Sequence, residues 1–166
     1  MVKVKIKIDK QVINEARVFG KEVHKRKKFN KDKFITGQEE TSDFLGFLFE
    51  FIVCDYFNKP RPVLYEGKQV DNYDIMLKGK KFDIKHSKIC FVNKDQYERH
   101  KGKTDGFLFG DTELLDFGTG SLFAYMFGWI DYDDVPSCSE IIRFKNGSEA
   151  YKVNKRKLKD IKELIE

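Results

Sequence analysis

The chain has 166 residues, 40% of them apolar and 36% charged, with 16 Phe and only 3 Pro. This length and composition are typical of one globular domain and exclude a disordered chain. The net charge of +5, much of it between residues 21 and 33, suits a polyanion such as DNA, although a solvated helix face would carry the same charges.

The first element predicted is a strand over residues 2–8, where apolar and cationic side chains alternate. Asp9 can cap the helix that follows, which ends in the basic stretch. No signal peptide is expected, since the alternation has no continuous apolar core, and the apolar run 44–54 is too short to span a membrane. We therefore expect a cytoplasmic protein without a membrane partner.

A second helix is expected to begin near Thr41 or Ser42, either of which can cap it, and to stop before Pro60. Short strands are then expected around 63–65, at 73–77 and at 81–87 continuing toward residue 91, with a turn at 78–80. A short helix over 94–100 comes next, then strands near 106–109, 121–130, 141–144 and 150–153, and a final helix over 155–165. This order predicts one α/β or α+β domain over residues 1–166 around a mixed sheet, with 1–40 as an N-terminal strand-helix extension.

The 3 cysteines, Cys54, Cys90 and Cys138, are odd in number and share no C-x-x-C spacing. A disulfide framework and a structural zinc site are therefore not expected. The histidines are also too scattered for a zinc site, so we expect them to be packed or at the surface.

The most informative segment is the one from Tyr73 to His86. Side chains alternate faces along a strand, so Asp83 and Lys85 are expected side by side. The turn at 78–80 folds the strand of Asp74 back against them. Two converging carboxylates repel each other, and a hard divalent cation relieves the repulsion, which favours Mg²⁺. The alternative is an ordinary ion pair on the strand surface.

Glu50 is the one charge within the apolar run 44–54. A carboxylate in a buried helix is costly to ionise unless a cation pairs with it. A metal ion or Lys85 is a candidate partner, and the alternative is that this helix face reaches solvent.

Together, Gly46 to Glu50 in an apolar helix, Asp74 opening a strand, and the D-x-K sequence at 83–85 resemble the PD-(D/E)XK nuclease superfamily. The resemblance implies a restriction-endonuclease-like mixed sheet flanked by helices, in the order helix-strand-strand-strand-helix-strand. It also implies hydrolysis of DNA with Mg²⁺, for which Mn²⁺ can substitute.

The resemblance implies roles for these residues. The Asp74 and Asp83 carboxylates and the Ile84 carbonyl would ligate the metal, Lys85 would be the catalytic lysine, and Glu50 would support the metal directly or through water. Asp74 follows a tyrosine rather than the proline of the motif. Asp71 is a rival for the first acid, but Asp74 leads directly into the apolar strand.

Four polar residues after the motif are candidates for contacts with DNA: Lys88, Lys94, Gln96 and Arg99. Each could equally be solvated surface. The aromatic run 123–129 could stack on bases, but its length and period suit a buried strand better.

The leading hypothesis is a metal-dependent DNA endonuclease, and a homodimer is plausible from the resemblance. Two alternatives stay open. One is a catalytically inactive nucleic-acid-binding module of the same fold, and the other is an interaction protein in which Asp83 and Lys85 form only a surface ion pair.

Overall fold

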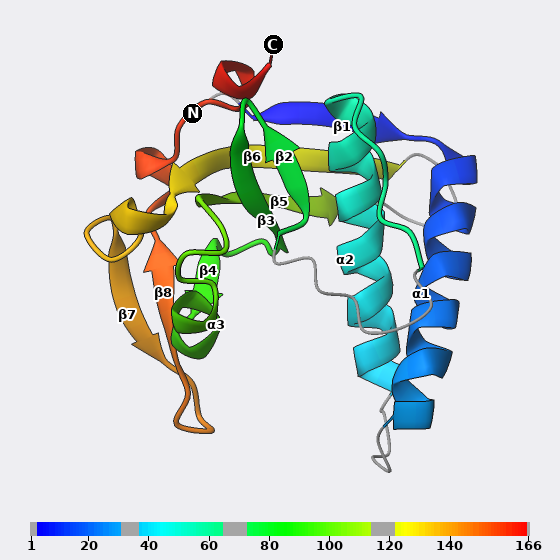
Figure 1. The fold of residues 1–166 in the computed structure, drawn as a ribbon, viewed down its shortest axis with the longest axis horizontal. Coiled ribbons are helices and arrows are strands. Elements are labelled where there is room, and N and C mark those ends of the chain that lie inside the picture. Colours follow the sequence, from blue (N-terminus) through cyan, green and yellow to red (C-terminus); the bar gives the residue numbers. More distant parts are fainter. Residues whose placement is uncertain (1–2, 31–36, 65–72, 114–121, 166) are drawn as a thin grey trace. The chain divides into compact units, whose positions relative to one another are not determined.

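The computed structural model describes residues 3–30, 37–64, 73–113 and 122–165 (Figure 1). The chain divides into two compact units. Unit 1 comprises residues 1–5, 70–111 and 125–166, and unit 2 comprises residues 6–69 and 112–124. In the described part of the chain, no helix is both long enough and apolar enough to cross a membrane.

Two long helices, α1 (Lys10–Asn30) and α2 (Gly37–Tyr56), lie side by side in unit 2 (Figure 1). The predicted cap of α1 is confirmed, because the Gln11 backbone N–H donates to Asp9 Oδ1 at 2.8 Å. Phe19 of α1 meets Phe47 and Phe51 of α2 edge-on, with ring centroids 4.9 and 5.3 Å apart.

Helix α2 begins at Gly37, so the start predicted near Thr41 or Ser42 is wrong. Residues 38–40, Gln-Glu-Glu, are polar but have good helix propensity, and the helix extends through them without an apolar signal.

The segment after α2 also differs from the prediction. A strand was expected around 63–65, but residues 63 and 64 have no regular structure, and residue 65 lies outside the described residues. Arg61 holds this segment instead by ion pairs to Asp55, at 2.6 Å, and to Glu15 of α1.

Five strands of the described chain form one sheet, in the order β1-β6-β5-β3-β2. Their bounds are β1 Val4–Ile8, β2 Ile75–Leu77, β3 Lys80–His86, β5 Gly106–Glu113 and β6 Leu122–Asp131. Strand β3 is antiparallel to β2 and parallel to β5, so the predicted mixed sheet is confirmed.

A second sheet has the order β4-β8-β7, with β4 at Phe91–Asn93, β7 at Ser139–Arg143 and β8 at Glu149–Val153. The prediction that the strand of 81–87 continues toward Phe91 is therefore wrong. After the Ser87 amide donates to Gly110, the Ser87 hydroxyl accepts from the Ile89 amide at 3.3 Å and turns the chain. The break places β4 in the second sheet.

The short helix predicted over 94–100 is confirmed as α3 (Lys94–Arg99), which follows β4 directly. Its Tyr97 stacks on Tyr132 with centroids 4.3 Å apart, and each hydroxyl donates to the other residue's backbone carbonyl. These tyrosines belong to a buried core with Phe107 and Phe109 of β5 and Val153 of β8. The core fixes α3 and β5 in relation to each other.

The final helix predicted over 155–165 is wrong. The chain forms two short 3₁₀ turns, η2 (Lys155–Lys157) and η3 (Ile161–Leu164), capped by the Asn154 and Asp160 side chains. Between them, Lys159 exchanges backbone hydrogen bonds of 3.1 and 2.8 Å with Trp129 of β6. Pairing with β6 overrides the helix propensity of the lysine-rich tail.

Candidate active site

Strands β2 and β3 form a tight hairpin that brings Asp74 to Asp83. Lys78 and Gly79 of the turn both have positive φ, 48° and 74°, as two-residue hairpin turns require. Ile75 pairs with Phe82, and the Asp74 amide donates to the Phe82 carbonyl at 2.9 Å, so Asp74 comes next to Asp83 across the two strands. The Asp74 carboxylate accepts a 2.7 Å hydrogen bond from the Ile84 amide.

Asp83 and Lys85 lie on the same face of β3, as predicted. Lys85 Nζ is 2.5 Å from Asp83 Oδ2. The angles between the two groups do not fit a hydrogen bond, so this buried oxygen has no hydrogen-bond partner. Asp83 is only 7% exposed, and the Lys85 side chain is 18% exposed. The pair is therefore not a solvated ion pair on a strand surface, and Asp83 keeps an oxygen that accepts no hydrogen bond.

The electrostatics of Asp74 reflect this crowding. Burial of its carboxyl raises the pKa of Asp74 to about 7, and the nearby charge of Asp83 adds to this shift. The hydrogen bond from the Ile84 amide and the charge of Lys85 act in the opposite direction and lower the pKa. The Asp74 residue as a whole is exposed, whereas its carboxylate is turned toward Ile84 and Asp83. The upward direction of the pKa shift follows first from burial of the carboxyl and second from the charge of Asp83.

Helix α3 and strand β5 supply the surroundings of Lys85. Its ammonium donates to Gln96 Oε1 at 3.3 Å and lies 6.0 Å from the centre of the Phe107 ring. Gln96, a candidate for contacts with DNA, is thus held by the predicted catalytic lysine.

His100 also belongs to these surroundings, although it is not part of the sequence motif. Its buried Nδ1 makes no hydrogen bond. Burial lowers the pKa of His100, while the charge of Asp83 raises it and that of Lys85 lowers it. The four-residue spacing between Gln96 and His100, which puts both on one face of a helical turn, is the signal that could have found it.

The pair of carboxylates fits a hard divalent cation. Like charges meet at Asp74 and Asp83, and one buried Asp83 oxygen accepts no hydrogen bond. The N–H and C=O of a strand residue point to the same side, so the Ile84 carbonyl faces the same edge as its amide, which reaches Asp74. Within the described residues, no three Asp, Glu, His or Cys side chains gather into a metal-binding group.

Glu50 lies on α2, where its side chain is half-buried. It belongs to unit 2, so its predicted role rests on the sequence alone. Asp71, the rival for the first acid, lies outside the described residues.

The predicted DNA-contacting cations differ in their surroundings. Lys94 forms a 3.0 Å ion pair with Glu149 and lies over the Tyr151 ring, so a structural role already occupies its charge. Arg99 is exposed and donates to the Asp95 carbonyl at 3.2 Å. Lys88 is exposed in the segment after β3.

The other predicted features lie apart from these acids. His24 is buried, and His86, on the opposite face of β3, lies 3.3 Å from Asp111 of β5. Within the aromatic run 123–129, Phe127 and Trp129 are buried, which favours core packing over base stacking.

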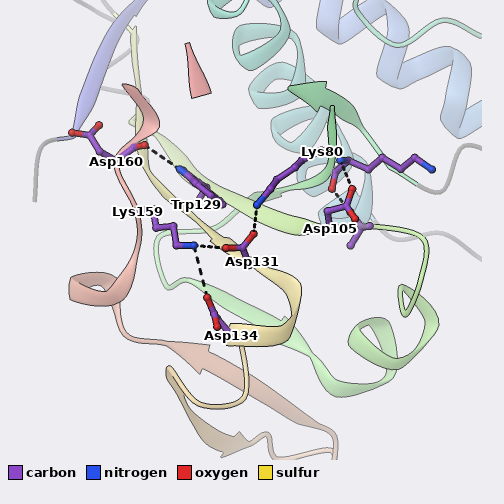
Figure 2. A network of polar contacts seen from close by, with 9 residues as sticks. Lys80, Asp105, Trp129, Asp131, Asp134, Lys159 and Asp160 are labelled. Atoms are coloured by element: carbon purple, nitrogen blue, oxygen red, sulfur yellow. Dashed lines mark hydrogen bonds and ion pairs between the residues drawn. The ribbon is translucent and has the colours of Figure 1, made fainter. Parts of the chain in front are cut away.

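A second group of acids and lysines lies elsewhere in unit 1, around Trp129 (Figure 2). Asp131 pairs with Lys80 at 2.6 Å and with Lys159, and both ammonium groups lie over the Trp129 ring, 5.2 and 4.6 Å from its centre. The Trp129 indole donates to the Asp160 carbonyl at 3.0 Å. This cluster fastens the tail of the chain to β6.

Comparison of the chain with protein-family models, with curated proteins and with solved structures gives no match.

Proposed function

We propose that this protein is a metal-dependent DNA endonuclease of the PD-(D/E)XK type, with a restriction-endonuclease-like fold. The observation that carries the proposal is the convergence of Asp74 with the buried Asp83, whose neighbour Lys85 lies 2.5 Å away. At this spacing the two acids can bind a divalent cation, and the lysine can pair with a phosphate group.

In this proposal each residue has a distinct role. The Asp74 and Asp83 carboxylates and the Ile84 carbonyl hold Mg²⁺, or Mn²⁺ in its place. The metal, when bound, supplies the positive charge that lowers the pKa of water and offsets charge on the scissile phosphate. Lys85 stabilises the negative charge that develops on that phosphate and orients the attacking water. From the sequence, Glu50 supports the same metal.

The surrounding residues keep Lys85 ready for this role. Gln96 accepts a hydrogen bond from its ammonium, and the Phe107 ring lies beneath it. Such contacts hold a flexible lysine in one place, which is a requirement for catalysis by positioning.

The order of elements α2-β2-β3-β4-α3-β5 supports the proposed fold, since it reproduces the order helix-strand-strand-strand-helix-strand. One departure is that β4 pairs in the second sheet. In the proposal, DNA is the substrate, Lys88 and Arg99 contact its phosphates, and a homodimer cuts both strands.

The experiment is cleavage of supercoiled, linear and branched DNA with Mg²⁺ or Mn²⁺ by the parent chain and by Asp83→Asn. We expect metal-dependent cleavage by the parent and its loss in the variant. Equal cleavage by both proteins would show that the proposal is wrong.

A nucleic-acid-binding module without catalysis is the second candidate. It is favoured by the Lys85 ammonium, which already balances the Asp83 charge without a metal. This candidate predicts DNA binding that weakens steeply with salt and is indifferent to Mg²⁺ and to Asp83→Asn.

A further inference from the structure

Unit 1 contains a cavity of about 620 Å³ that shares only Lys88 with the residues of the proposed nuclease activity. It is bounded by the segment between β3 and β4, by the start of β7 and by the end of β8. Its polar lining includes four lysines, one glutamate and a serine: Lys88, Lys152, Lys155, Lys157, Glu140 and Ser139. We propose that this cavity binds a phosphate ester of nucleotide size.

The charges of the lining favour an anion. Glu140 forms a 2.6 Å ion pair with Lys152, so the charge of the carboxylate in the lining is already neutralised. Lys88 and Lys157 are exposed, and neither side chain has a hydrogen bond or ion pair among the described residues. Ammonium groups without a counter-charge around a concave surface attract phosphate.

Lys155 is held in place before any ligand arrives. Its ammonium donates to the Lys88 carbonyl at 2.7 Å and lies 3.9 Å from the centre of the buried Phe127 ring. A cation fixed in this way loses little conformational freedom on binding, which favours affinity.

The backbone around the cavity is also fixed. The Val153 amide donates to the Cys90 carbonyl at 2.7 Å, and the Asn154 amide donates to the Cys138 carbonyl at 3.0 Å. These bonds join the end of β8 to the segments that precede β4 and β7, one on each side. The cavity is therefore formed without the ligand, as small-molecule sites commonly are.

Ser139 lines the cavity, but its hydroxyl oxygen is closed to solvent and has no hydrogen-bond partner. That oxygen does not face the cavity, so the lysine ammonium groups are the polar groups that meet a ligand there.

The two cysteines of the lining do not point to thiol chemistry. Strand β8 lies between Cys90 and Cys138, and two steps between neighbouring strands separate their backbones by about 10 Å, too far for a disulfide. Burial raises the pKa of Cys90 to about 11, so its thiol stays protonated.

The volume of the cavity limits the kinds of ligand that it can hold. Its volume lies within the range of roughly 300–1,000 Å³ for small-molecule sites, well above the needs of a bare phosphate ion. Ile89, which is 52% exposed, adds apolar surface that suits a base. A nucleotide combines these apolar and anionic parts.

The test is titration of the whole chain with deoxyadenosine monophosphate, followed by calorimetry and amide NMR shifts. The matched variants are Lys88→Glu with Lys157→Glu, inside the cavity, and Lys145→Glu with Lys162→Glu, at exposed positions outside it. Both change the net charge equally. We expect the cavity variant to bind about tenfold or more weakly, and the control to bind like the parent.

Equal binding of deoxyadenosine without phosphate, equal weakening in both double-lysine variants, or no binding at millimolar nucleotide would overturn the proposal.

The source of the phosphate is distinguished by a tetranucleotide carrying a 5′-phosphate or a 5′-hydroxyl. A preference for the phosphorylated strand would identify a strand end as the ligand, and tighter binding of the free mononucleotide would identify a metabolite. All titrations are repeated on Asp83→Asn. Because the cavity does not depend on that residue, failure of the nuclease proposal leaves this test intact.

Discussion

The cluster of Asp74, Asp83 and Lys85 has two carboxylates and one ammonium. In the cluster around Trp129, Asp131 lies between the ammonium groups of Lys80 and Lys159, and Lys159 also lies 3.8 Å from Asp134. Burial alone would raise the pKa of Asp131, but hydrogen bonds from both lysines hold it below the ordinary value. The pKa of Asp74 moves the opposite way. Similar residues thus form a structural tie in one place and a site with surplus negative charge in the other.

The largest expected difference between the two clusters is in the rate of DNA cleavage after one of their residues is replaced. Asp83→Asn and Lys85→Ala should each lower the rate of DNA cleavage by about 100-fold or more, because each removes a group that the reaction uses directly. Asp131→Asn, which also removes a paired acid, should leave the rate unchanged. A gel assay at fixed Mg²⁺ measures all three, and equal losses in all three would mean that the effect is structural.

The second effect is on stability. Asp131→Asn should lower the free energy of unfolding by about 1 kcal/mol, since two partly exposed ion pairs are lost. Urea denaturation measures the change, with the exposed Asp133→Asn as a control expected to unfold like the parent. A loss that is equally large in the control would contradict a specific role for the cluster.

The two clusters should also respond oppositely to pH. The pKa of Asp74 is raised on folding, so its stabilising contribution is present below its unfolded pKa of about 4 and is lost as pH rises toward about 7. The pKa of Asp131 is lowered, so its contribution is present above about 4 and is lost as pH falls. NMR titration of the aspartate carboxyl carbons without metal measures both.

The same titration can be repeated with Mg²⁺ and on a variant of Asp83. Mg²⁺, or Asp83→Asn, should each move the midpoint of Asp74 to lower pH, because a cation favours the ionised form and the lost neighbour no longer opposes it. The midpoint of Asp131 should not respond to either change. If Mg²⁺ left the Asp74 midpoint unmoved, the two acids would not be a metal site.

The smallest effect is expected at Gln96. Replacing it with Ala removes the 3.3 Å hydrogen bond to Lys85 but leaves the lysine charge, so the cleavage rate should fall only a few-fold, in keeping with about 1 kcal/mol for one such bond. Single-turnover kinetics measure it, with exposed Glu98→Ala on the same helix as a control. A loss as large as that of Lys85→Ala would assign Gln96 a direct role.

Local patterns predicted much of what is near in sequence. The alternation of faces in β3 placed Asp83 beside Lys85, the Lys78-Gly79 turn brought Asp74 back to them, and Asp9 caps α1. Each of these depends on residues within about ten positions of one another, where strand period, turn geometry and capping decide the outcome.

Interactions between distant residues could not be predicted in this way. The tail has helix propensity, but pairing of Lys159 with Trp129 outweighs it. The surroundings of Lys85 include Phe107 and His100 because the core packs α3 against β5, and no local pattern encodes that packing. The position of β4 in the second sheet has the same origin.

The pairing of Lys159 with Trp129 also affects when the protein can fold during synthesis. Unit 2 takes its last residue at position 124, whereas unit 1 draws on residues from both ends of the sequence, up to position 166. A ribosome adds about 5–20 residues per second, so the roughly 30 residues between β6 and Asp160 take about 1.5–6 s to synthesise. During that interval the indole N–H of Trp129 lacks its Asp160 acceptor.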